Sequence, residues 1–445
     1  MNIGIVGTGY VGIVSGCCFA EEGNSVICYD IDEEKIRSYS ACKSPIFEPG
    51  LKELLKKNIA EKRLSFTTDI KELVNSSEII FICVGTPPMN DGSADLSQVE
   101  AAVRAIAENS PKNSYKIIVE KSTVPVGTHM HLKTITKLYN KGKSRFDFVV
   151  NSEFLKEGNA IADFMNPDRI VIGVETDRAR DTLLKLYECF DTKKLVVDPS
   201  SAEIIKYASN SFLAMKISFI NMVADLCEKT GGDIENISQG LGYDGRIGRS
   251  FLDAGIGYGG SCFPKDVKAF IKVMEEHLVD SSLIKSVDNF NSIRYKKIIS
   301  ILQDELWILK NKEIALWGLA FKPETDDIRE APSINIVREL LNMEAKVSLY
   351  DPKAEENFRK IFPQSQNVRY EAEPLKALEN CEALVILTEW EEFRKIDPCD
   401  IYSALALPIV IDGRNIFPSD KMKELEFRYF PIGKGVILRD MRNSK

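Results

Sequence analysis

The residues best suited to chemistry lie in the segment GIGYGGSCFPKD, residues 255–266. Its single cysteine, Cys262, follows a glycine-rich turn and precedes an expected helix, with Pro264 suited to the first helical position and Ser261 to the cap. The positive end of the helix dipole and the nearby Lys265 both favour a thiolate. This placement predicts a nucleophilic cysteine, against the plainer interpretation of a small buried residue.

A glycine motif near the start predicts a dinucleotide site. An apolar strand at 2–6 runs into a helix through GTGYVG, and a second strand at 25–29 ends in Asp30. An acid at that offset meets the adenosine ribose hydroxyls and repels a 2′-phosphate, which favours NAD over NADP. Lys35 either assists at the ribose or is a solvated helix residue. The turn residues expected at the cofactor are Gly7, Gly9, Tyr10, Val11 and Gly12.

Polar side chains follow three further expected strands, at 78–84, 116–120 and 146–150. The carboxyl ends of parallel strands form the edge at which such sheets bind ligands. Hydroxyl groups are also common turn residues and glutamates are usually exposed, so each position has a plain alternative. Two of the carboxylates, four residues apart, share a face if their turn is helical. The candidates are Thr86, Thr123, Glu153 and Glu157.

A long helix is expected over 202–228, where no proline or glycine occurs. Apolar residues recur at alternating steps of three and four, which predicts a seam that is either a core element or the axis of a dimer. On another face, Lys206 and Asn210 lie one turn apart. They are either solvated or, if they border the Cys262 turn, suited to stabilise a developing alkoxide.

The pattern of the first half returns from residue 312. Strands are expected at 313–317 and 346–350, and the turn between them carries Lys322 without a GxGxxG motif, so it should hold phosphate by charge. Arg414 follows a strand on a tight turn, apt for a phosphate or a uracil edge. Arg329 lies in a charged segment, residues 325–330, where a surface salt bridge is the main rival to a binding role. The fold class predicted is α/β, with two doubly wound sheets joined by a helical central region containing one long helix.

Composition excludes several classes of function. The chain has 445 residues, a net charge of −8, 44% hydrophobic and 28% charged residues. Basic residues are scattered, so no nucleic-acid or membrane surface is expected, and no apolar run approaches the roughly 18 residues of a membrane span. Ten cysteines without a CxxC pair and the absence of a signal peptide suggest a cytoplasmic protein with reduced thiols. Three histidines without metal-ligand spacing predict no metal.

These motifs, in order, resemble the UDP-glucose/GDP-mannose dehydrogenase family, and the resemblance covers nearly the whole chain. It implies an NAD-binding Rossmann domain at 1–197, a central helical domain with the cysteine loop and a dimer contact at 198–295, and a Rossmann-like UDP-sugar domain at 296–445. The motifs are GTGYVG at Gly7, EKSTVPVG at Glu120, SEFLKEG at Ser152, the Lys206 and Asn210 helix, GYGGSCFPKD at Gly257, GLAFKPETDDIR at Gly318 and DGR at Asp412.

The resemblance implies a four-electron oxidation of UDP-glucose at C6 to UDP-glucuronate, in which two NAD are reduced and Cys262 forms a thiohemiacetal and then a thioester. The implied catalytic residues are Cys262, Lys206, Asn210, Asp266, Glu153 and Thr123. Those facing NAD, besides the glycine turn, are Asp30, Lys35, Thr86, Thr123, Glu157, Lys265 and Arg329. Those at the UDP-sugar are Glu153, Phe154, Leu155, Lys206, Asn210, Phe251, Tyr258, Gly259, Phe321, Lys322 and Arg414, with Arg246 from a neighbouring subunit of a homodimer or larger homo-oligomer.

Three alternatives stay open at this point. Within the family, the substrate could be GDP-mannose or a UDP-N-acetylhexosamine. A two-electron dehydrogenase of the hydroxyacid type would need neither Cys262 nor Lys322. A non-catalytic NAD-binding protein would not need candidates for every catalytic role.

Overall fold

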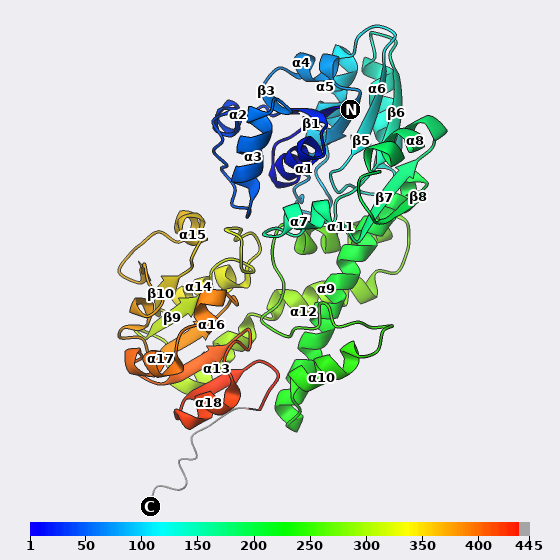
Figure 1. Cartoon of the computed structure of the whole chain (residues 1–445). Coiled ribbons are helices and arrows are strands. Elements are labelled where there is room, and N and C mark those ends of the chain that lie inside the picture. The colour runs from blue at the N-terminus through cyan, green and yellow to red at the C-terminus, as the bar shows by residue number, and fades with distance from the viewer. Residues whose placement is uncertain (436–445) are drawn as a thin grey trace, which may run out of the picture. The chain divides into compact units, whose positions relative to one another are not determined.

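The computed structural model describes residues 1–435 and divides into two compact units. Unit 1 comprises Met1–Ser209 and Lys268–Val279; unit 2 comprises Asn210–Val267 and the chain from Asp280 onward. Two helices, α9 (Pro199–Thr230) and α11 (Phe263–Glu276), contribute residues to both units. None of the helices described is long and apolar enough to cross a membrane. The predicted α/β fold with a long helix is confirmed (Figure 1).

Unit 1 contains an eight-stranded sheet in the order β3-β2-β1-β4-β5-β6-β7-β8. All neighbours pair in parallel except β6 and β7, which are antiparallel. β4 is apolar throughout, and β1 is apolar after Asn2, because helices cover both faces of the sheet. The strands are β1 Asn2–Val6, β2 Ser25–Tyr29, β3 Leu64–Thr67, β4 Ile79–Ile82, β5 Tyr115–Glu120, β6 Arg145–Val150, β7 Arg169–Val174 and β8 Lys193–Val197.

Two hydrophobic layers flank this sheet. Helices α1, α3, α7 and α8 pack on one side and α4, α5 and α6 on the other. Short connections between strands and helices leave the carboxyl ends of the strands as the edge where the glycine turn and the later loops lie. The helices are α1 Tyr10–Glu21, α2 Glu33–Ser40, α3 Leu51–Ala60, α4 Ile70–Ser76, α5 Ser97–Asn109, α6 Thr128–Tyr139, α7 Ala160–Met165 and α8 Asp177–Leu186.

Unit 2 repeats the same strand sequence in a six-stranded parallel sheet, β11-β10-β9-β12-β13-β14. Counted from its own first strand, the order is 3-2-1-4-5-6, that of a doubly wound nucleotide-binding sheet. Its strands are β9 Glu313–Trp317, β10 Lys346–Tyr350, β11 Val368–Tyr370, β12 Ala383–Ile386, β13 Ile409–Asp412 and β14 Arg428–Pro431. Its helices are α10 Ile234–Gly242, α12 Ser282–Ile293, α13 Lys296–Leu306, α14 Pro332–Asn342, α15 Glu355–Ile361, η1 Lys376–Leu378, α16 Glu391–Arg394, α17 Pro398–Ala404 and α18 Ser419–Glu424.

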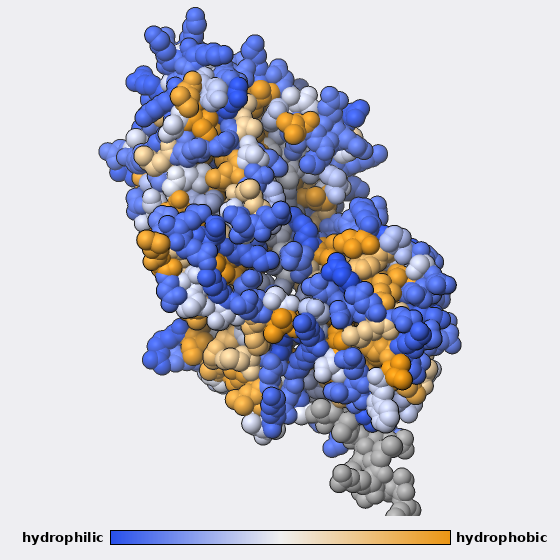
Figure 2. Space-filling view, turned by 180° about the vertical axis from the view of Figure 1, so that it is seen from behind, coloured by the Kyte–Doolittle hydropathy of each residue, from blue (hydrophilic) through white to orange (hydrophobic). Residues whose placement is uncertain are grey.

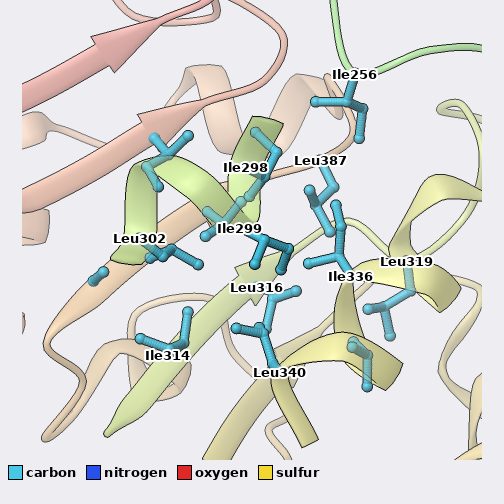
Figure 3. Packing of buried hydrophobic residues seen from close by; sticks show 14 of the residues in the cluster. Ile256, Ile298, Ile299, Leu302, Ile314, Leu316, Leu319, Ile336, Leu340 and Leu387 are labelled. Carbon is cyan, nitrogen blue, oxygen red and sulfur yellow. The ribbon is translucent and has the colours of Figure 1, made fainter. Parts of the chain in front are cut away.

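One hydrophobic cluster of unit 2 anchors the loop that carries the candidate nucleophile. Side chains of β9, α13 and α14 interdigitate there, and Ile256 from the loop before Cys262 joins them (Figure 3). Ile256 is 2% exposed. A Cβ on the neighbouring Gly413 would stand 2.7 Å from Ile256 Cγ2, so the turn after β13 closes over this anchor. The position of the cysteine loop is therefore fixed by core packing.

The seam predicted on the long helix is largely solvent-exposed in the single chain. Phe212, Phe219, Met222 and Leu226 are 48–60% exposed, whereas residues on the opposite side of α9, such as Ala214 and Ile220, are fully buried. Elsewhere, hydrophilic residues cover most of the face seen in Figure 2, with apolar residues in separate groups. An apolar row of this kind on a single helix is typical of a surface that packs against another chain.

Two local expectations need correction. Helix α11 begins at Phe263, one residue earlier than predicted, so Pro264 takes the second helical position and Cys262 itself is the residue before the helix. The segment from Asn151 to Lys156 is irregular, so the argument that Glu153 and Glu157 share a helical face does not apply. In both places tight loop geometry, which spacing does not encode, decides the outcome.

Candidate active site

The three glycines of the first turn have different structural tasks. Gly7 has φ +94°, and a Cβ there would stand 2.9 Å from the Cys83 carbonyl oxygen. A Cβ on Gly12 would come within 1.9 Å of the Gly7 carbonyl oxygen, so only glycine lets α1 approach the turn. Gly9 meets nothing within 4 Å and is exposed at the N-terminus of α1. This open backbone is where a pyrophosphate would be cradled.

Asp30 fastens this turn to the end of β2. Its Oδ2 accepts the Thr8 N–H and the Thr8 hydroxyl, each at 2.8 Å, and its Oδ1 accepts the Asp32 N–H at 3.1 Å. Burial pushes the pKa of Asp30 upward, but these hydrogen bonds and the charge of Lys35, 4.0 Å away, hold it below its usual value. An ionised carboxylate beside the turn suits NAD and disfavours a 2′-phosphate.

A buried glutamate that sequence reasoning missed links the glycine turn to the loop after β6. Glu48, 6% exposed, accepts a short hydrogen bond from the Tyr10 hydroxyl. The same carboxylate accepts the Gly158 N–H at 2.7 Å and the Ala160 N–H at 2.7 Å. Gly158 and Ala160 lie over 100 residues from Glu48, and Tyr10 lies 38 residues from it, so no local pattern could have indicated this link. It ties the predicted cofactor turn to the segment that carries Glu153.

Glu153 and Lys206 form a buried ion pair within unit 1. Lys206 Nζ donates to the Glu153 carbonyl oxygen at 2.6 Å and to Glu153 Oε1 at 2.9 Å. The side chains are 7% and 4% exposed, so water screens the pair little. Burial pushes the pKa of Glu153 upward, but the charge and hydrogen bond of Lys206 hold it below its usual value, helped by the Leu155 N–H. The carboxylate is therefore ionised at neutral pH and faces an ammonium group.

Other predicted residues of unit 1 lie around this pair and the glycine turn. The Phe154 ring lies 4.0 Å from the Arg169 guanidinium and 5.1 Å from Lys206 Nζ. The Thr86 hydroxyl donates to the Thr123 carbonyl oxygen at 2.9 Å, which joins the loops after β4 and β5. Glu157 is half-buried in the loop before Gly158.

Glu120, at the end of β5, is a second buried acid that sequence reasoning did not single out. It is 2% exposed, and neither carboxylate oxygen makes a hydrogen bond with any residue in the described range. Burial raises its pKa well above the usual value, and the neighbouring Glu203 adds to the shift. Glu203 itself accepts the backbone N–H groups of Gly127 and His129 and contacts His129 Nδ1 at 3.1 Å.

Glu120→Gln is expected to raise the free energy of unfolding at pH 8 by about 1–3 kcal/mol, because the amide does not titrate, whereas each unit of raised pKa of a buried carboxyl costs about 1.4 kcal/mol above its usual pKa. Because the folded-state pKa of Glu120 is raised, the wild type loses stability as pH rises above the usual glutamate value. The gain should therefore vanish near pH 4. Urea unfolding at both pH values checks this, with the exposed Glu78→Gln as control. A variant less stable than the wild type at pH 8 would contradict it.

In unit 2, Cys262 ends the glycine loop immediately before α11. Its thiol is half-buried, and its carbonyl oxygen accepts the Asp266 N–H at 2.8 Å, closing the first helical turn. Ser261 Oγ lies 3.5 Å from Cys262 Sγ. Asp266, 1% exposed, accepts the Asn210 side-chain amide and Lys265 Nζ, both at 2.6 Å. A thiol at a helix start, with polar groups fixed one turn further on, is an arrangement that a nucleophilic cysteine can use.

The glycines before Cys262 permit close packing against the segment from Phe321 to Ala331. Gly260 has φ +85° and its N–H donates to the Arg329 carbonyl oxygen at 2.8 Å. A Cβ on Gly260 would stand 2.8 Å from the Phe321 ring, and one on Gly259 would stand 2.5 Å from the Glu330 carbonyl oxygen. The glycine loop before Cys262 and the segment from Phe321 to Ala331 are thus brought together within unit 2.

Further predicted substrate residues surround the same loop. The Phe263 ring lies 6.1 Å from that of Phe251 and 5.9 Å from that of Tyr258. Arg414 donates to the Leu387 carbonyl oxygen at 2.8 Å and pairs with Glu389 at 3.2 Å, and a Cβ on Gly255 would stand 3.0 Å from its Nη1. A guanidinium held this way beside a glycine loop can receive a phosphate or a uracil edge.

Three basic residues of unit 2 are placed differently. Lys322 Nζ lies 5.6 Å from the Phe321 ring centroid. Arg329 pairs with Asp327 and its side chain is 63% exposed, while Arg246 pairs with Asp244 and is 90% exposed. Both arginines thus form exposed ion pairs, and the role of Arg329 at NAD stays a prediction.

The first turn of the second sheet differs from that of the first. Gly318 has φ +89°, and a Cβ there would stand 2.5 Å from Thr388 Cβ. The N–H groups of Leu319 and Ala320 donate to Asp351 Oδ2 at 2.6 and 3.1 Å. The backbone donors of this turn are thus used inside the protein, and the turn has no open glycine comparable to Gly9.

The described residues offer no set of side chains that could bind a metal ion. Across residues 1–435, no group of three or more His, Cys, Asp or Glu side chains is placed to hold a metal ion.

The open glycine turn and the ionised Asp30 are features of a domain that binds a nicotinamide dinucleotide, as in NAD-dependent dehydrogenases. Three models of the UDP-glucose/GDP-mannose dehydrogenase family match the chain in order. The NAD binding domain matches residues 1–191, the central domain residues 200–293 and the UDP binding domain residues 315–419. The chain belongs to this family and is an NAD-dependent oxidoreductase.

Individual relatives agree with this assignment. The chain is 43% identical to the UDP-glucose 6-dehydrogenase TuaD of Bacillus subtilis, with 98% of this chain and 94% of the relative covered. Its structure matches that of a UDP-glucose dehydrogenase from Pyrobaculum islandicum with a TM-score of 0.90 and 37% identity, covering 99% and 98% of the two chains. A UDP-D-ManNAc dehydrogenase from Pyrococcus horikoshii matches with a TM-score of 0.85 and 26% identity, covering 98% and 100%.

Proposed function

We propose that this protein oxidises the C6 alcohol of UDP-glucose to a carboxylate, producing UDP-glucuronate and two NADH. The observation that carries the proposal is the half-buried Cys262 at the start of α11, with Asn210, Asp266 and Lys265 held together one turn away. Relatives named UDP-glucose 6-dehydrogenase match almost the whole chain and support this substrate.

The reaction proceeds in three chemical stages. NAD, when bound, accepts the hydride in each of the two oxidations. The first converts the alcohol to an aldehyde, to which the Cys262 thiolate adds to form a thiohemiacetal. The second oxidation gives a thioester, which water cleaves to release the carboxylate and regenerate the thiol. The sum is one alcohol, two NAD⁺ and one water giving one carboxylate, two NADH and three protons.

The remaining polar residues have distinct roles in this proposal. Lys206 and Asn210 stabilise the oxyanion of the adduct, and Asp266 orients Asn210 through the 2.6 Å hydrogen bond and takes part in proton transfer. Glu153 is the general base that activates the hydrolytic water, since it is ionised at neutral pH, and Thr123 helps to position that water.

We further propose that two chains associate through the exposed seam of α9 and that Arg246 contacts the sugar nucleotide of the partner subunit. The seam residues Phe212, Phe219, Met222 and Leu226 are more exposed than apolar residues of a monomer usually are. The Arg246 side chain, 90% exposed, can extend beyond its own chain. Light scattering at micromolar concentration should give at least a dimer mass; a monomer mass would overturn this part.

The first test of the proposed reaction is the number of NADH formed per sugar nucleotide consumed. A ratio of two with UDP-glucose is expected, because the thioester stage requires a second hydride transfer. GDP-mannose and UDP-N-acetylhexosamines serve as competing substrates, the latter motivated by the 26% identical relative. A ratio of one would remove Cys262 from its role and favour a two-electron dehydrogenase. Turnover of another sugar nucleotide alone would replace UDP-glucose as substrate.

A further inference from the structure

Lys121, directly after β5, is a buried cation for which the proposed reaction assigns no role. Its residue surface is 5% exposed, and its Nζ lies 3.2 Å from Asn151 Oδ1 and 3.4 Å from the Asn151 carbonyl oxygen. The ammonium also faces the rings of Phe81 and Phe164, at 5.9 and 6.0 Å from their centroids. Burying a lysine costs several kcal/mol unless an opposite charge or hydrogen bonds compensate its ammonium group.

Asn151 holds Lys121 at this position through a fixed set of hydrogen bonds. The Asn151 side-chain amide donates to the Val171 carbonyl oxygen at 2.8 Å, which sets which way its oxygen points. That oxygen then accepts both Lys121 Nζ at 3.2 Å and the Tyr187 hydroxyl at 2.5 Å. The ammonium is therefore held between a polar group and two aromatic faces, without a direct carboxylate partner in residues 1–435.

Lys121 and Glu153 line the same cavity, which has a volume of about 120 Å³. This volume has room for several water molecules, since one needs about 10–15 Å³ of such space. Lys206 approaches Glu153 from α9, whereas Lys121 faces it from the end of β5. The other ionisable groups lining the cavity are Lys156, Asp163, Asp168, Arg169 and Tyr187. Two ammonium groups thus act on one carboxylate from different elements.

The electrostatics agree with this geometry. Burial lowers the pKa of Lys121, and the charge of Glu153 opposes that change, as does the nearby Cys83. Burial raises the pKa of the Cys83 thiol to about 12, so this thiol is neutral near pH 7 and adds no anion. Lys121 in turn contributes to the lowered pKa of Glu153. Both Lys206 and Lys121 thus lower the pKa of the Glu153 carboxyl group.

We propose that Lys121 is a positioning residue whose charge keeps Glu153 ionised while Lys206 turns to the oxyanion of the substrate. The inference rests on the proposed role of Glu153 as general base. When an adduct draws the Lys206 ammonium toward itself, Glu153 loses part of its counter-charge and burial would favour its protonation. Lys121, fixed by Asn151, is independent of the substrate and maintains the carboxylate as a base throughout the cycle.

The test is the pH dependence of kcat at saturating UDP-glucose and NAD. On the alkaline side of the profile, Lys121→Met is expected to keep an activity close to that of the wild type. On the acidic side its kcat should fall about tenfold further below that of the wild type, because Glu153 in the variant becomes protonated at a higher pH than in the wild type. Lys121→Arg, which keeps the charge, should retain the wild-type profile on the acidic side. A uniform loss across the pH range in Lys121→Met would show a purely structural role and overturn the inference.

A matched control lies in β5, the strand that directly precedes Lys121. Lys116 in β5 is 6% exposed and donates to the Ser77 carbonyl oxygen at 2.5 Å, outside the Glu153 cavity. Lys116→Met removes a buried lysine charge equally but should leave the acidic side of the profile unchanged. Glu153→Gln separates the two proposals: if it turns over like the wild type, the base assignment fails, whereas if it is inactive and Lys121→Met keeps the wild-type profile, only the inference on Lys121 fails.

Discussion

Cys262→Ser should abolish steady turnover of UDP-glucose, with a loss of about 10³-fold or more in kcat. A serine hydroxyl at the start of α11 stays protonated at neutral pH, so it cannot add to the aldehyde or form the thioester as a thiolate does. NADH release per sugar should fall to one or less, because only the first oxidation remains open. NAD affinity should be unchanged, since the glycine turn and Asp30 are untouched; fluorescence titration with NADH measures this directly.

The chain supplies controls for that substitution. Cys189 and Cys399 are exposed, so Cys189→Ser and Cys399→Ser test whether any accessible thiol matters. Both should turn over like the wild type. A Cys262→Ser enzyme within tenfold of wild-type kcat would contradict covalent catalysis, and unchanged NADH binding without turnover would exclude the interpretation of the protein as a non-catalytic NAD binder.

Lys206→Met should be the most destabilising of these substitutions, by about 3–5 kcal/mol at pH 8, because it leaves Glu153 buried without its hydrogen-bonded cation. In the wild type the folded-state pKa of Glu153 is lowered, so the pair stabilises above the usual glutamate value and this contribution is lost as pH falls. The difference between variant and wild type should therefore shrink toward pH 4. Denaturant unfolding at pH 8 and pH 4 measures it.

A double variant separates the lost pair from the lost packing. Lys206→Met with Glu153→Gln removes both charges and should recover more than half of the stability lost in Lys206→Met alone, without recovering activity. If the double variant is as unstable as the single one, the cost comes from the apolar packing of the Lys206 stem and not from the buried carboxylate. Activity of Lys206→Met near the wild-type level would contradict its role at the oxyanion.

The fold was predictable where strands are short, apolar and bounded by turns. β1, β2, β9 and β10 have the bounds predicted from the sequence, and β4, β5 and β6 differ from the predicted bounds by one or two residues. The prediction succeeded because a strand buried on both faces of a parallel sheet is marked by a continuous apolar run. Helix α9 extends three residues beyond its predicted start and two beyond its end, since helix termini depend on local capping and not on periodicity.

The site was predictable only where a residue type follows an element end. Cys262, Glu153 and the glycine turn were proposed as site residues that way, and their roles stay predictions. Glu48 and Glu120 were not, because their significance comes from partners that are distant in sequence or from the lack of any partner. Lys121 lies inside a motif that was quoted, yet only the cavity shows that its ammonium faces Glu153. The three-domain division stays a prediction, since compactness divides the chain into two units.

The contrast between the two first turns has a kinetic consequence. In residues 1–435 the turn of the first sheet has the open Gly9, whereas the turn of the second sheet has no such glycine, so we expect one dinucleotide site per chain. In the proposed reaction, two NAD molecules would then be used in succession, and the first NADH would leave while the sugar remains bonded to Cys262. Exchange of NADH for NAD would then be a step inside the catalytic cycle. In a cell with a high NADH concentration, the enzyme would accumulate in the state between the two oxidations.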